Sequence, residues 1–332
     1  MDTKISVLAA ALCAVTIAAS SPAQAALYNF QNIDVPFSGA HNSAATAIND
    51  SGQIVGYYFD TAGNELGFLD DHGTFSVVND PLAVGDTRAY GINNNGQIVG
   101  HYYDATGGRH GFLDTAGSYT TLDYPAAQWT FARGINGTGN AIVGFYYASF
   151  QNHAFLYDGS NFTSLGDPSW NASASYAWGA NDAGQIVGYY VGTGGQNFGF
   201  VDTGGTYTTL QVPGATDTYA RGITNTGLIV GNYRTGSGTY GFLYDSKANS
   251  YTTISDPNGV GFTTALGING NGQIVGYYQD GSAVHGFLAT PVPLPGSAQL
   301  MGTGLLGLLG WQRRNAARPR ATGSATPRAA RP

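Results

Sequence analysis

The sequence predicts an all-β fold built from six copies of one unit of four short strands. A single stretch, typified by Gly91-Ile-Asn-Asn-Asn-Gly-Gln-Ile-Val-Gly100, recurs along most of the chain. Its copies begin at Ala47, Gly91, Gly134, Gly179, Gly222 and Gly267, which are 43 to 45 residues apart. A period this regular, in this range, indicates an array of like supersecondary units.

The second copy of the repeat shows its four strands most clearly. Arg88–Asn93 is a short apolar run that ends in an Asn-Asn-Gly turn. The next segment, Gln97–Tyr103, is rich in β-forming residues and is too short for a helix. A Gly-rich loop leads to a third strand at His110–Asp114 and a fourth at Ser118–Leu122. We therefore expect three hairpin connections in each repeat.

Repeats of this length with four strands are typical of β-propeller blades, which stack around an axis because one blade cannot bury both of its faces alone. The strand nearest the axis is crowded and needs small side chains. The position two residues before each motif copy meets this need, because it is Ala every time. These residues are Ala45, Ala89, Ala132, Ala177, Ala220 and Ala265. The pattern predicts a six-bladed β-propeller of four-stranded blades.

The two ends of the repeat array predict how the ring closes. The sixth repeat stops after Gly286–Ala289 and lacks a fourth strand, whereas the mature chain begins with a strand-like segment at Leu27–Ile33. We expect this N-terminal strand to complete the last blade, so that residues 26–290 form one closed propeller. An open solenoid is the alternative, and it would leave exposed strand edges at both ends.

Residues 1–25 have the pattern of a signal peptide. Lys4 gives a weakly basic start, an apolar segment follows, and a small-x-small sequence ends at Ala25, the predicted cleavage site. The apolar segment is too short to cross a membrane permanently. Cys13, the only cysteine, lies within it. The mature chain would therefore have no thiol, no disulfide and no Cys-based metal site.

The charge of the repeat region predicts an exported domain without a nucleic-acid partner. Between residues 26 and 295 there are 19 acidic and six basic residues, so the net charge is 6 − 19 = −13. A surface of this sign repels phosphate backbones and attracts cations or cationic partners.

The composition changes abruptly near residue 291. Residues 291–332 contain a Pro-x-Pro motif at Pro293 and Pro295, then a short apolar segment rich in Gly, then an Arg cluster that opens at Arg313 and Arg314. Arginines that follow an apolar segment are expected on the cytoplasmic side of a membrane. The apolar segment is short, which suits a transient transmembrane helix better than a permanent one.

This tail resembles a PEP-CTERM sorting signal in its Val-Pro-Leu-Pro variant. It departs from the usual form at Leu294, where Glu is common, and in its longer basic end. The resemblance implies transient anchoring in the inner membrane, processing near the motif by an exosortase, and a final place at the cell surface or outside the cell. The repeats are similar to exported HAF repeats, because His153-Ala-Phe155 accompanies the Gly-Ile-Asn-x-x-Gly pattern. That resemblance covers residues 27–289 and implies no settled activity.

No group of ionisable residues stands out as a catalytic or metal site. His110, His153 and His285 share a slot that other repeats fill with Leu, Phe or Tyr, which predicts packing rather than ligation. Glu65 is the only Glu, and the Asp residues stand where turns need them. We therefore expect no cofactor. Calcium at the turn 49–52 is the alternative, but equivalent turns lack the acid.

Aromatic residues supply the candidate ligand-binding site. Tyr pairs that end the second strand in five repeats are expected to pack between sheets. Repeat symmetry does not account for Trp129, Phe131, Trp170 and Trp178, which lie in the links and first strands of the middle repeats. The links and the loops after second strands also vary most between copies, and they should emerge on one face. The competing interpretation is that these rings fill gaps between blades.

Two functional hypotheses follow. The first is a non-catalytic binding or extracellular-matrix module that holds a polysaccharide or a surface protein on its variable face. Aromatic rings on an acidic surface suit neutral sugars, which stack without needing charge. The second is an enzyme that acts on extracellular polysaccharide with an Asp-based site in the propeller funnel. A glycosidase needs two carboxylates at one cleft, and the sequence singles out no such pair, so the first hypothesis is preferred.

Overall fold

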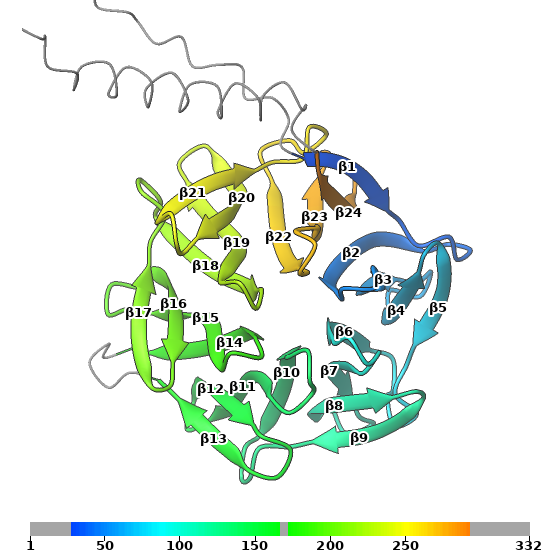
Figure 1. The fold of residues 1–332 in the computed structure, drawn as a ribbon. Helices are drawn as coiled ribbons and strands as arrows, with labels where there is room; N and C mark the ends of the chain where they lie inside the picture. Colours follow the sequence, from blue (N-terminus) through cyan, green and yellow to red (C-terminus); the bar gives the residue numbers. More distant parts are fainter. Residues whose placement is uncertain (1–27, 167–171, 293–332) are drawn as a thin grey trace, which may run out of the picture. The chain divides into compact units, whose positions relative to one another are not determined.

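The computed structural model describes residues 28–166 and 172–292. All secondary-structure elements assigned within these ranges are β-strands, and their sheets form a β-propeller (Figure 1). The predictions of an all-β fold and of a propeller are therefore confirmed. Several predicted features lie outside the described residues: Ala25 and the leader, Trp170, Pro293, Pro295, Arg313 and Arg314.

Four sheets have four strands each. The first comprises β2 (His41–Ile48), β3 (Ile54–Phe59), β4 (Glu65–Asp71) and β5 (Thr74–Val78). The second comprises β14 (Ala174–Ala180), β15 (Gln185–Val191), β16 (Asn197–Thr203) and β17 (Thr206–Leu210). The third comprises β18 (Asp217–Ile223), β19 (Leu228–Thr235), β20 (Gly238–Asp245) and β21 (Ser250–Ile254). The fourth comprises β22 (Thr263–Ile268), β23 (Ile274–Gln279), β24 (Val284–Pro291) and β1 (Tyr28–Ile33).

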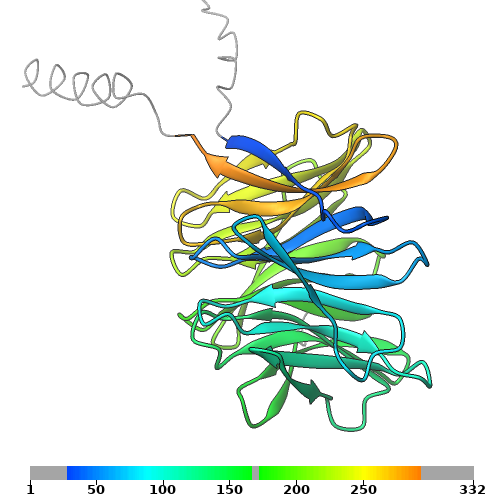
Figure 2. The ribbon, with the colours of Figure 1, turned by 90° about the vertical axis from the view of Figure 1, so that its right-hand side faces the viewer.

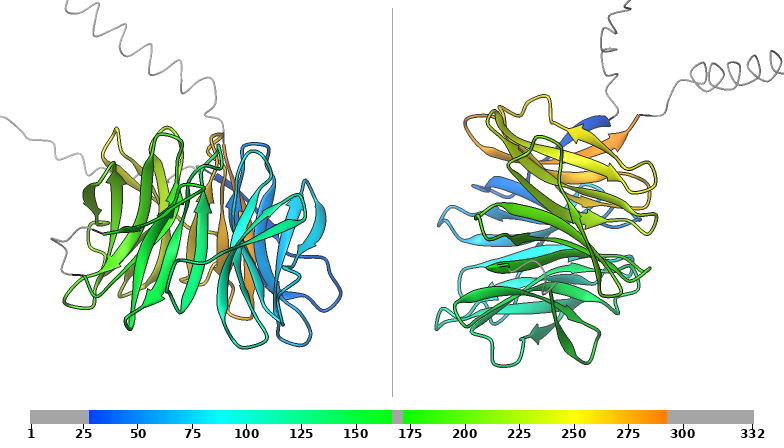
Figure 3. Two further views of the ribbon diagram at one scale, coloured as in Figure 1. Left: turned by 90° about the horizontal axis from the view of Figure 1, so that it is seen from below. Right: turned by 90° about the vertical axis from the view of Figure 1, so that its left-hand side faces the viewer.

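The fifth sheet has eight strands and spans the second and third repeats. Its first half comprises β6 (Thr87–Ile92), β7 (Ile98–Tyr103), β8 (Arg109–Thr115) and β9 (Ser118–Leu122). Its second half comprises β10 (Trp129–Ile135), β11 (Ile142–Ala148), β12 (Gln151–Tyr157) and β13 (Phe162–Leu165). The two halves are joined by one parallel residue pair, Trp129 with Arg109. Figure 1 shows the sheets arranged radially, with the first strand of each repeat nearest the axis, and Figure 3 shows the same ribbon from two further sides.

The N-terminal strand completes the last sheet, as the ends of the array predicted. β1 pairs antiparallel with β24, from Tyr28 opposite Pro291 to Ile33 opposite Gly286 (Figure 2). The same sheet packs against the first repeat. A Cβ atom on Gly286 would lie 3.2 Å from the backbone nitrogen of Ala45. The chain therefore meets its own beginning both within a sheet and between sheets.

A Phe-Gly contact in each repeat forms the core of the sheets. The third-strand Phe is fully buried in every copy: Phe68, Phe112, Phe155, Phe200, Phe242 and Phe287. Its ring lies over a second-strand Gly that leaves room for it. A Cβ atom on Gly188, for example, would lie 2.9 Å from the Phe200 ring and would overlap the carbonyl oxygen of Tyr176. The first-strand Ala residues are likewise fully buried, which confirms the need for a small residue there.

The Asn of the repeated motif explains why the motif recurs. The Asn93 side chain accepts a hydrogen bond from the backbone N–H of Gln97 (2.9 Å) and so closes the turn between the first two strands. The same side-chain type also links repeats, because Asn49 Nδ2 donates to the carbonyl oxygen of Asn93 (3.1 Å). Asn269 Nδ2 donates in turn to the carbonyl oxygen of Asn49 (3.0 Å), which joins the last repeat to the first.

The turn that the sequence offered as a calcium alternative takes part in a further link between repeats. The Asp50 carboxylate accepts hydrogen bonds from Asn94 Nδ2 (2.8 Å) and from the backbone N–H of Gly270 (2.6 Å). These donors come from the turns of the second and the sixth repeat. Asp50 therefore has a turn-bridging role in the fold, and calcium at this turn stays a prediction.

Candidate ligand-binding site

A pocket of about 370 Å³ opens on the propeller axis. It lies at the end of the channel where first strands begin and second strands end, which is where the variable links and loops emerge. Aromatic rings make much of its wall, and Thr, Asn and Arg side chains supply the polar groups. The lining includes Tyr57, Tyr90, Tyr176, Trp178, Tyr189, Tyr219, Arg221, Asn232, Arg234 and Tyr277.

One position of the first strand directs side chains into the channel below this pocket. It is the residue just before each motif copy, and the register of the first two strands shifts there in every repeat. Such a β-bulge re-aims a side chain. The six side chains line a narrower space of about 80 Å³ on the axis. They are Thr46, Tyr90, Arg133, Trp178, Arg221 and Leu266. We call them the bulge ring.

Four consecutive members of the bulge ring stack as alternating aromatic rings and guanidinium groups. The Arg133 guanidinium carbon lies 3.7 Å from the centre of the Tyr90 ring and 4.9 Å from that of Trp178. The Arg221 guanidinium carbon lies 3.8 Å from the centre of the Trp178 ring. Cation–π contacts of this kind are each worth about 0.5–2 kcal/mol, with the larger values where water is excluded.

Arg133 is buried and Arg221 is half-buried, and neither arginine has a carboxylate partner among the described residues. Arg133 is only 9% exposed. Its Nε and Nη1 atoms, Nη1 of Arg221 and Nε1 of Trp178 have no hydrogen-bond partner within residues 28–166 and 172–292. Arg221 does make one bond, from its Nε to the side-chain oxygen of Asn232 (3.3 Å). The bulge ring therefore holds several N–H groups without a partner among the described residues and two positive charges.

Arg88 differs from these two arginines because it is paired. It forms an ion pair with Glu65, and its Nη1 donates to the Tyr90 hydroxyl (3.2 Å). The positive charges act on their neighbours. Burial alone would raise the pKa of Tyr90, but Arg133 and Arg88 outweigh it and hold that pKa below its ordinary value. Burial, reinforced by Arg133 and Arg88, holds the pKa of His101 well below its ordinary value, so this imidazole is neutral.

The structure separates the four aromatic residues that the sequence singled out. Trp178 lines the pocket. Phe131 is buried outside the pocket wall and packs between His101, with ring centres 4.9 Å apart, and Phe145, at 4.6 Å. Trp129 lies outside the pocket wall, stacked on Tyr147 at 4.8 Å. Trp170 falls outside the described residues.

The paired tyrosines at the ends of second strands do not all pack between sheets as expected. Tyr58 and its equivalents, such as Tyr278, are buried against third strands. Their neighbours Tyr57, Tyr189 and Tyr277 line the pocket instead. The reason is the alternation of a β-strand, in which adjacent residues point to opposite faces. Two adjacent Tyr residues therefore cannot share one packing environment.

Sequence reasoning missed the arginines of the bulge ring, although a signal was present. Arg133 and Arg221 stand between an Ala that is present in every copy and a residue that is Gly in five copies and Ala in the first, at a position that differs between copies. A variable residue flanked by constant small ones marks a site where the fold tolerates different side chains. The bulge that turns this position toward the axis has no signature in the residues themselves.

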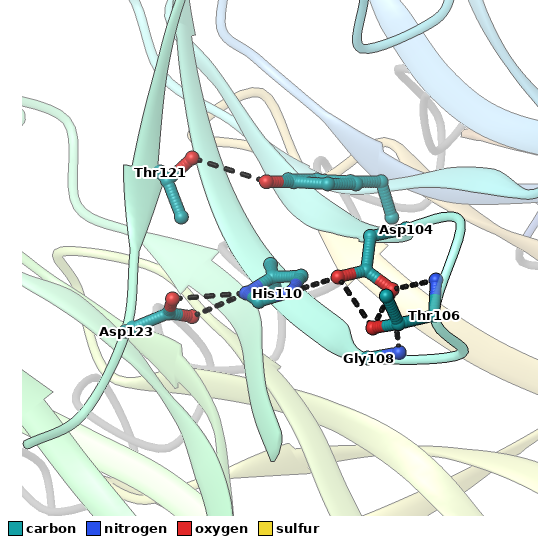
Figure 4. A network of polar contacts seen from close by, with 7 residues as sticks. Asp104, Thr106, Gly108, His110, Thr121 and Asp123 are labelled. Atoms are coloured by element: carbon teal, nitrogen blue, oxygen red, sulfur yellow. Dashed lines mark hydrogen bonds and ion pairs between the residues drawn. The ribbon is translucent and has the colours of Figure 1, made fainter. Parts of the chain in front are cut away.

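A second polar cluster surrounds His110 on the outer part of the second repeat (Figure 4). Its Nδ1 atom lies 2.9 Å from Asp123, and its Nε2 atom lies 3.2 Å from Asp104. The ring stacks on Tyr102 at 5.2 Å. The slot is therefore a packing position, as predicted, with an added Asp–His–Asp bridge. His285 makes the same bridge to Asp34 (3.0 Å) and Asp280 (3.4 Å).

Carboxylates lie outside the wall of the axial pocket. None of the residues that line the axial pocket is Asp or Glu. Within the described ranges, no three His, Cys, Asp or Glu side chains cluster so that they could hold a metal ion. The same part of the chain contains no helix long and apolar enough to cross a membrane.

Comparisons with known proteins bear on the fold. No protein-family model and no protein with a curated description matches the sequence. Among solved structures, TolB from Acinetobacter baumannii is similar with a TM-score of 0.53 and 14% identity over 65% of this chain. The chain spans 55% of that protein's length. The SapL1 lectin in complex with alpha methyl fucoside has a TM-score of 0.52 and 12% identity, covering 77% of this chain and 97% of the lectin. These similarities support the propeller fold.

Proposed function

We propose that this chain is a non-catalytic carbohydrate-binding module and that the sugar occupies the axial pocket. The observation that carries the proposal is the pocket wall, where Tyr176, Trp178, Tyr189 and Tyr219 surround a space of about 370 Å³. Small-molecule sites have volumes of roughly 300–1,000 Å³ and combine aromatic walls with a few polar groups. A space at the lower end of that range suits one or two sugar rings.

The proposal includes a propeller of six blades. Each repeat supplies one antiparallel four-stranded unit, and the eight-stranded sheet divides into two such units at its single connecting pair. Contacts at the axis pass from repeat to repeat. A Cβ atom on Gly222 would lie 3.4 Å from the Cα atom of Gly267, and one on Gly267 would lie 2.8 Å from that of Ala47. The sixth repeat therefore abuts the first.

The choice of a sugar rests on ring geometry and on a likeness of fold. Tyr176 and Tyr189 stack with ring centres 4.6 Å apart, and Tyr219 meets Tyr189 edge to face at 4.9 Å. Apolar faces of this kind pack against sugar rings, and neighbouring hydroxyl and amide groups hydrogen-bond to sugar hydroxyls. The SapL1 lectin, a protein of similar fold, binds a fucoside. Fold likeness alone does not fix function, so the pocket is the stronger argument.

Binding is favoured over hydrolysis because of the pocket wall. A glycosidase places two carboxylates on either side of the scissile bond. The residues that line this pocket offer tyrosines, an indole, amides and arginines. These groups can hold and orient a sugar, but they do not form the acid pair that the alternative enzyme requires.

A glycan array followed by one substitution tests the proposal. In Trp178→Leu the new residue is the one that Leu266 already supplies at the same position, so the fold should tolerate it. We expect the full-length chain to bind a set of glycans and the variant to lose about tenfold or more in affinity. Phe198→Leu is the matched control, because Phe198 lies outside the pocket wall and Leu66 fills its slot in the first repeat.

The outcomes separate a site from a packing role. If Trp178→Leu lowers the melting temperature by many degrees and leaves binding unchanged, the indole is a core residue. If the unchanged chain binds no glycan, the proposed function is wrong. The same array applied to Trp129→Leu and Phe131→Leu shows how far the site extends, since the sequence also proposed these two residues.

We further propose that the protein is exported and sorted to the cell envelope. The leader that ends at Ala25 and the tail with Pro293, Pro295, Arg313 and Arg314 support this proposal. We expect leader cleavage, transient inner-membrane anchoring and processing by an exosortase-type enzyme. Intact-mass measurement of surface-released protein tests it. A C-terminus still at Pro332 would contradict the processing step.

A further inference from the structure

The axial pocket is positively charged in a protein that is otherwise strongly acidic. The described ranges contain six basic residues, namely Arg88, Arg109, Arg133, Arg221, Arg234 and Lys247. Arg221 and Arg234 line the pocket, and Arg133 and Arg221 line the channel beneath it. Half of these basic side chains therefore meet at one site, although the repeat region has a net charge of −13 (6 − 19).

The other charges near the pocket are already compensated. Glu65 pairs with Arg88. Asp217 lies opposite Arg234 on the neighbouring strand and accepts hydrogen bonds from Asn197. Arg133 and Arg221 remain without a carboxylate among the described residues, and each is held by aromatic faces. The uncompensated charge thus belongs to these two.

Burying a guanidinium without a counter-ion is costly, and cation–π contacts return only part of that cost. Arginine does not escape by losing its proton, because it stays charged in proteins. Arg133, Arg221 and Trp178 line the channel, and their buried side-chain atoms without a hydrogen-bond partner among the described residues are all N–H groups. A group that complements them must accept several hydrogen bonds and carry negative charge. A carboxylate does both, and it matches the planar fork of a guanidinium.

We propose that the ligand of the axial pocket is an acidic sugar, whose carboxylate is bound by Arg133 and Arg221 while its ring packs against the pocket tyrosines. This inference rests on the proposed carbohydrate-binding function and names the class of sugar. It replaces the neutral sugar that the acidic composition of the chain suggested. The average charge of the surface does not describe the charge at the axis.

The test compares one oligosaccharide with its own uncharged form. Trigalacturonic acid and its methyl ester have the same rings and differ in charge at the carboxyl groups. Isothermal titration of the full-length chain should show about tenfold or more tighter binding of the acid than of the ester. The preference should shrink as salt is added, because ionic attraction is screened. A sulfated galactan oligosaccharide of equal length shows whether the anion must be a carboxylate.

Substitutions connect the preference to the two arginines. Arg221→Leu and Arg133→Leu introduce the residue that Leu266 supplies at the equivalent position. Each should abolish the preference for the acid, because the acid loses an ionic partner that the ester never had. Lys247→Ala is the matched control, since it removes one positive charge from an exposed position outside the pocket and should leave the preference intact.

Every other result contradicts a specific part of the proposal. Equal binding of acid and ester, or a preference that survives both arginine substitutions, overturns the acidic sugar and leaves the carbohydrate-binding function standing. If the protein binds the sulfated oligosaccharide but not trigalacturonic acid, the inference that the anion is a carboxylate is wrong. A protein that binds neutral glycans but neither uronate form also contradicts the inference. Failure to bind any glycan contradicts the proposed function itself.

Discussion

Two sets of positions in the same strands behave in opposite ways. The first set is identical in every repeat and comprises the first-strand Ala, the second-strand Gly and the third-strand Phe. The second set is the bulge ring, where neighbours such as Arg133, Trp178 and Leu266 differ from copy to copy. In the fourth repeat the two sets are adjacent, since Ala177 is fully buried between sheets and Trp178 faces the channel.

The difference shows how a symmetric fold can carry an asymmetric site. The constant set is fixed by contacts that recur between every pair of sheets, so the same side-chain volume is needed each time. At the axis, the six side chains of the bulge ring come together, and their only shared requirement is to fill the space between them. Variation there does not disturb the contacts between sheets. Stability therefore resides in the positions that repeat, and the proposed recognition site in those that do not.

The largest expected effect comes from removing the strand that closes the ring. Deleting 27–33 takes away β1, which pairs with β24 over six residues, and exposes the edge of that strand. It also removes Tyr28 and Phe30 from the core of the last sheet. We expect aggregation and loss of a single cooperative unfolding transition, because an unpaired edge is a template for other chains. Size-exclusion chromatography and thermal denaturation measure both effects, and a monomeric variant with unchanged melting would show that β1 is dispensable.

A substitution in the constant set should have the next largest effect. Phe112→Ala removes a fully buried ring between two sheets, which typically costs about 3–5 kcal/mol. Denaturant titration gives the change in the free energy of unfolding. Phe75→Ala is a useful comparison, because the Phe75 ring is only partly buried against the Phe68 ring. If the two variants are equally stable, the constant Phe is not the packing centre of its sheet.

The sequence predicted the repeats, their small first-strand Ala and the closing strand, and it could not predict the bulge ring. Equal spacing exposed the repeats, and the missing last strand at Ala289 together with the strand at Leu27 predicted closure. These signals are strong because every copy restates them. The site depends on a bulge that turns Arg133 and Arg221 inward and on the convergence of six repeats at one axis. Neither leaves a local pattern, so the sequence indicated Trp178 but not its two charged neighbours.

Replacing one charged member of the bulge ring should have a smaller effect on stability. Arg133→Leu removes a buried charge without a carboxylate partner among the described residues, and it also removes the stack on Tyr90. Loss of the buried charge should stabilise the fold, and loss of the stack should destabilise it. Exchange of buried charges for apolar groups is often neutral or stabilising. We expect the free energy of unfolding to stay within about 1 kcal/mol of the unchanged chain or to rise. A fall of several kcal/mol in the free energy of unfolding, measured by chemical denaturation, would show that Arg133 is required for stability, as the constant residues are.

The smallest expected effect concerns the Asp–His–Asp bridge at His110, a variable slot on the outer part of a sheet. His110 stacks on Tyr102 at 5.2 Å and 27°, and Phe198 stacks on Tyr190 in the same way, at 5.4 Å and 26°. His110→Phe therefore preserves the packing and removes only the polar bridge. Burial lowers the pKa of His110, but hydrogen bonds and charge from Asp123 and Asp104 outweigh it, so that the net pKa is raised above 6.5.

The direction of the pH dependence follows from these pKa values. Because the folded state holds the His110 proton more tightly than the unfolded state, the bridge stabilises fully below about pH 6.5, and the effect is lost as pH rises through the folded pKa. Hydrogen bonds from Thr106 and Gly108, with a smaller one from His110, lower the pKa of Asp104 to about 2, so this carboxylate stays charged down to strongly acidic pH. At pH 5 the unchanged chain should therefore melt at a higher temperature than His110→Phe, with a difference in the free energy of unfolding below about 1 kcal/mol. At pH 9 this difference should disappear. His285 keeps its own bridge in both proteins and cancels from the difference. A melting difference that is the same at both pH values would show that the bridge contributes packing alone.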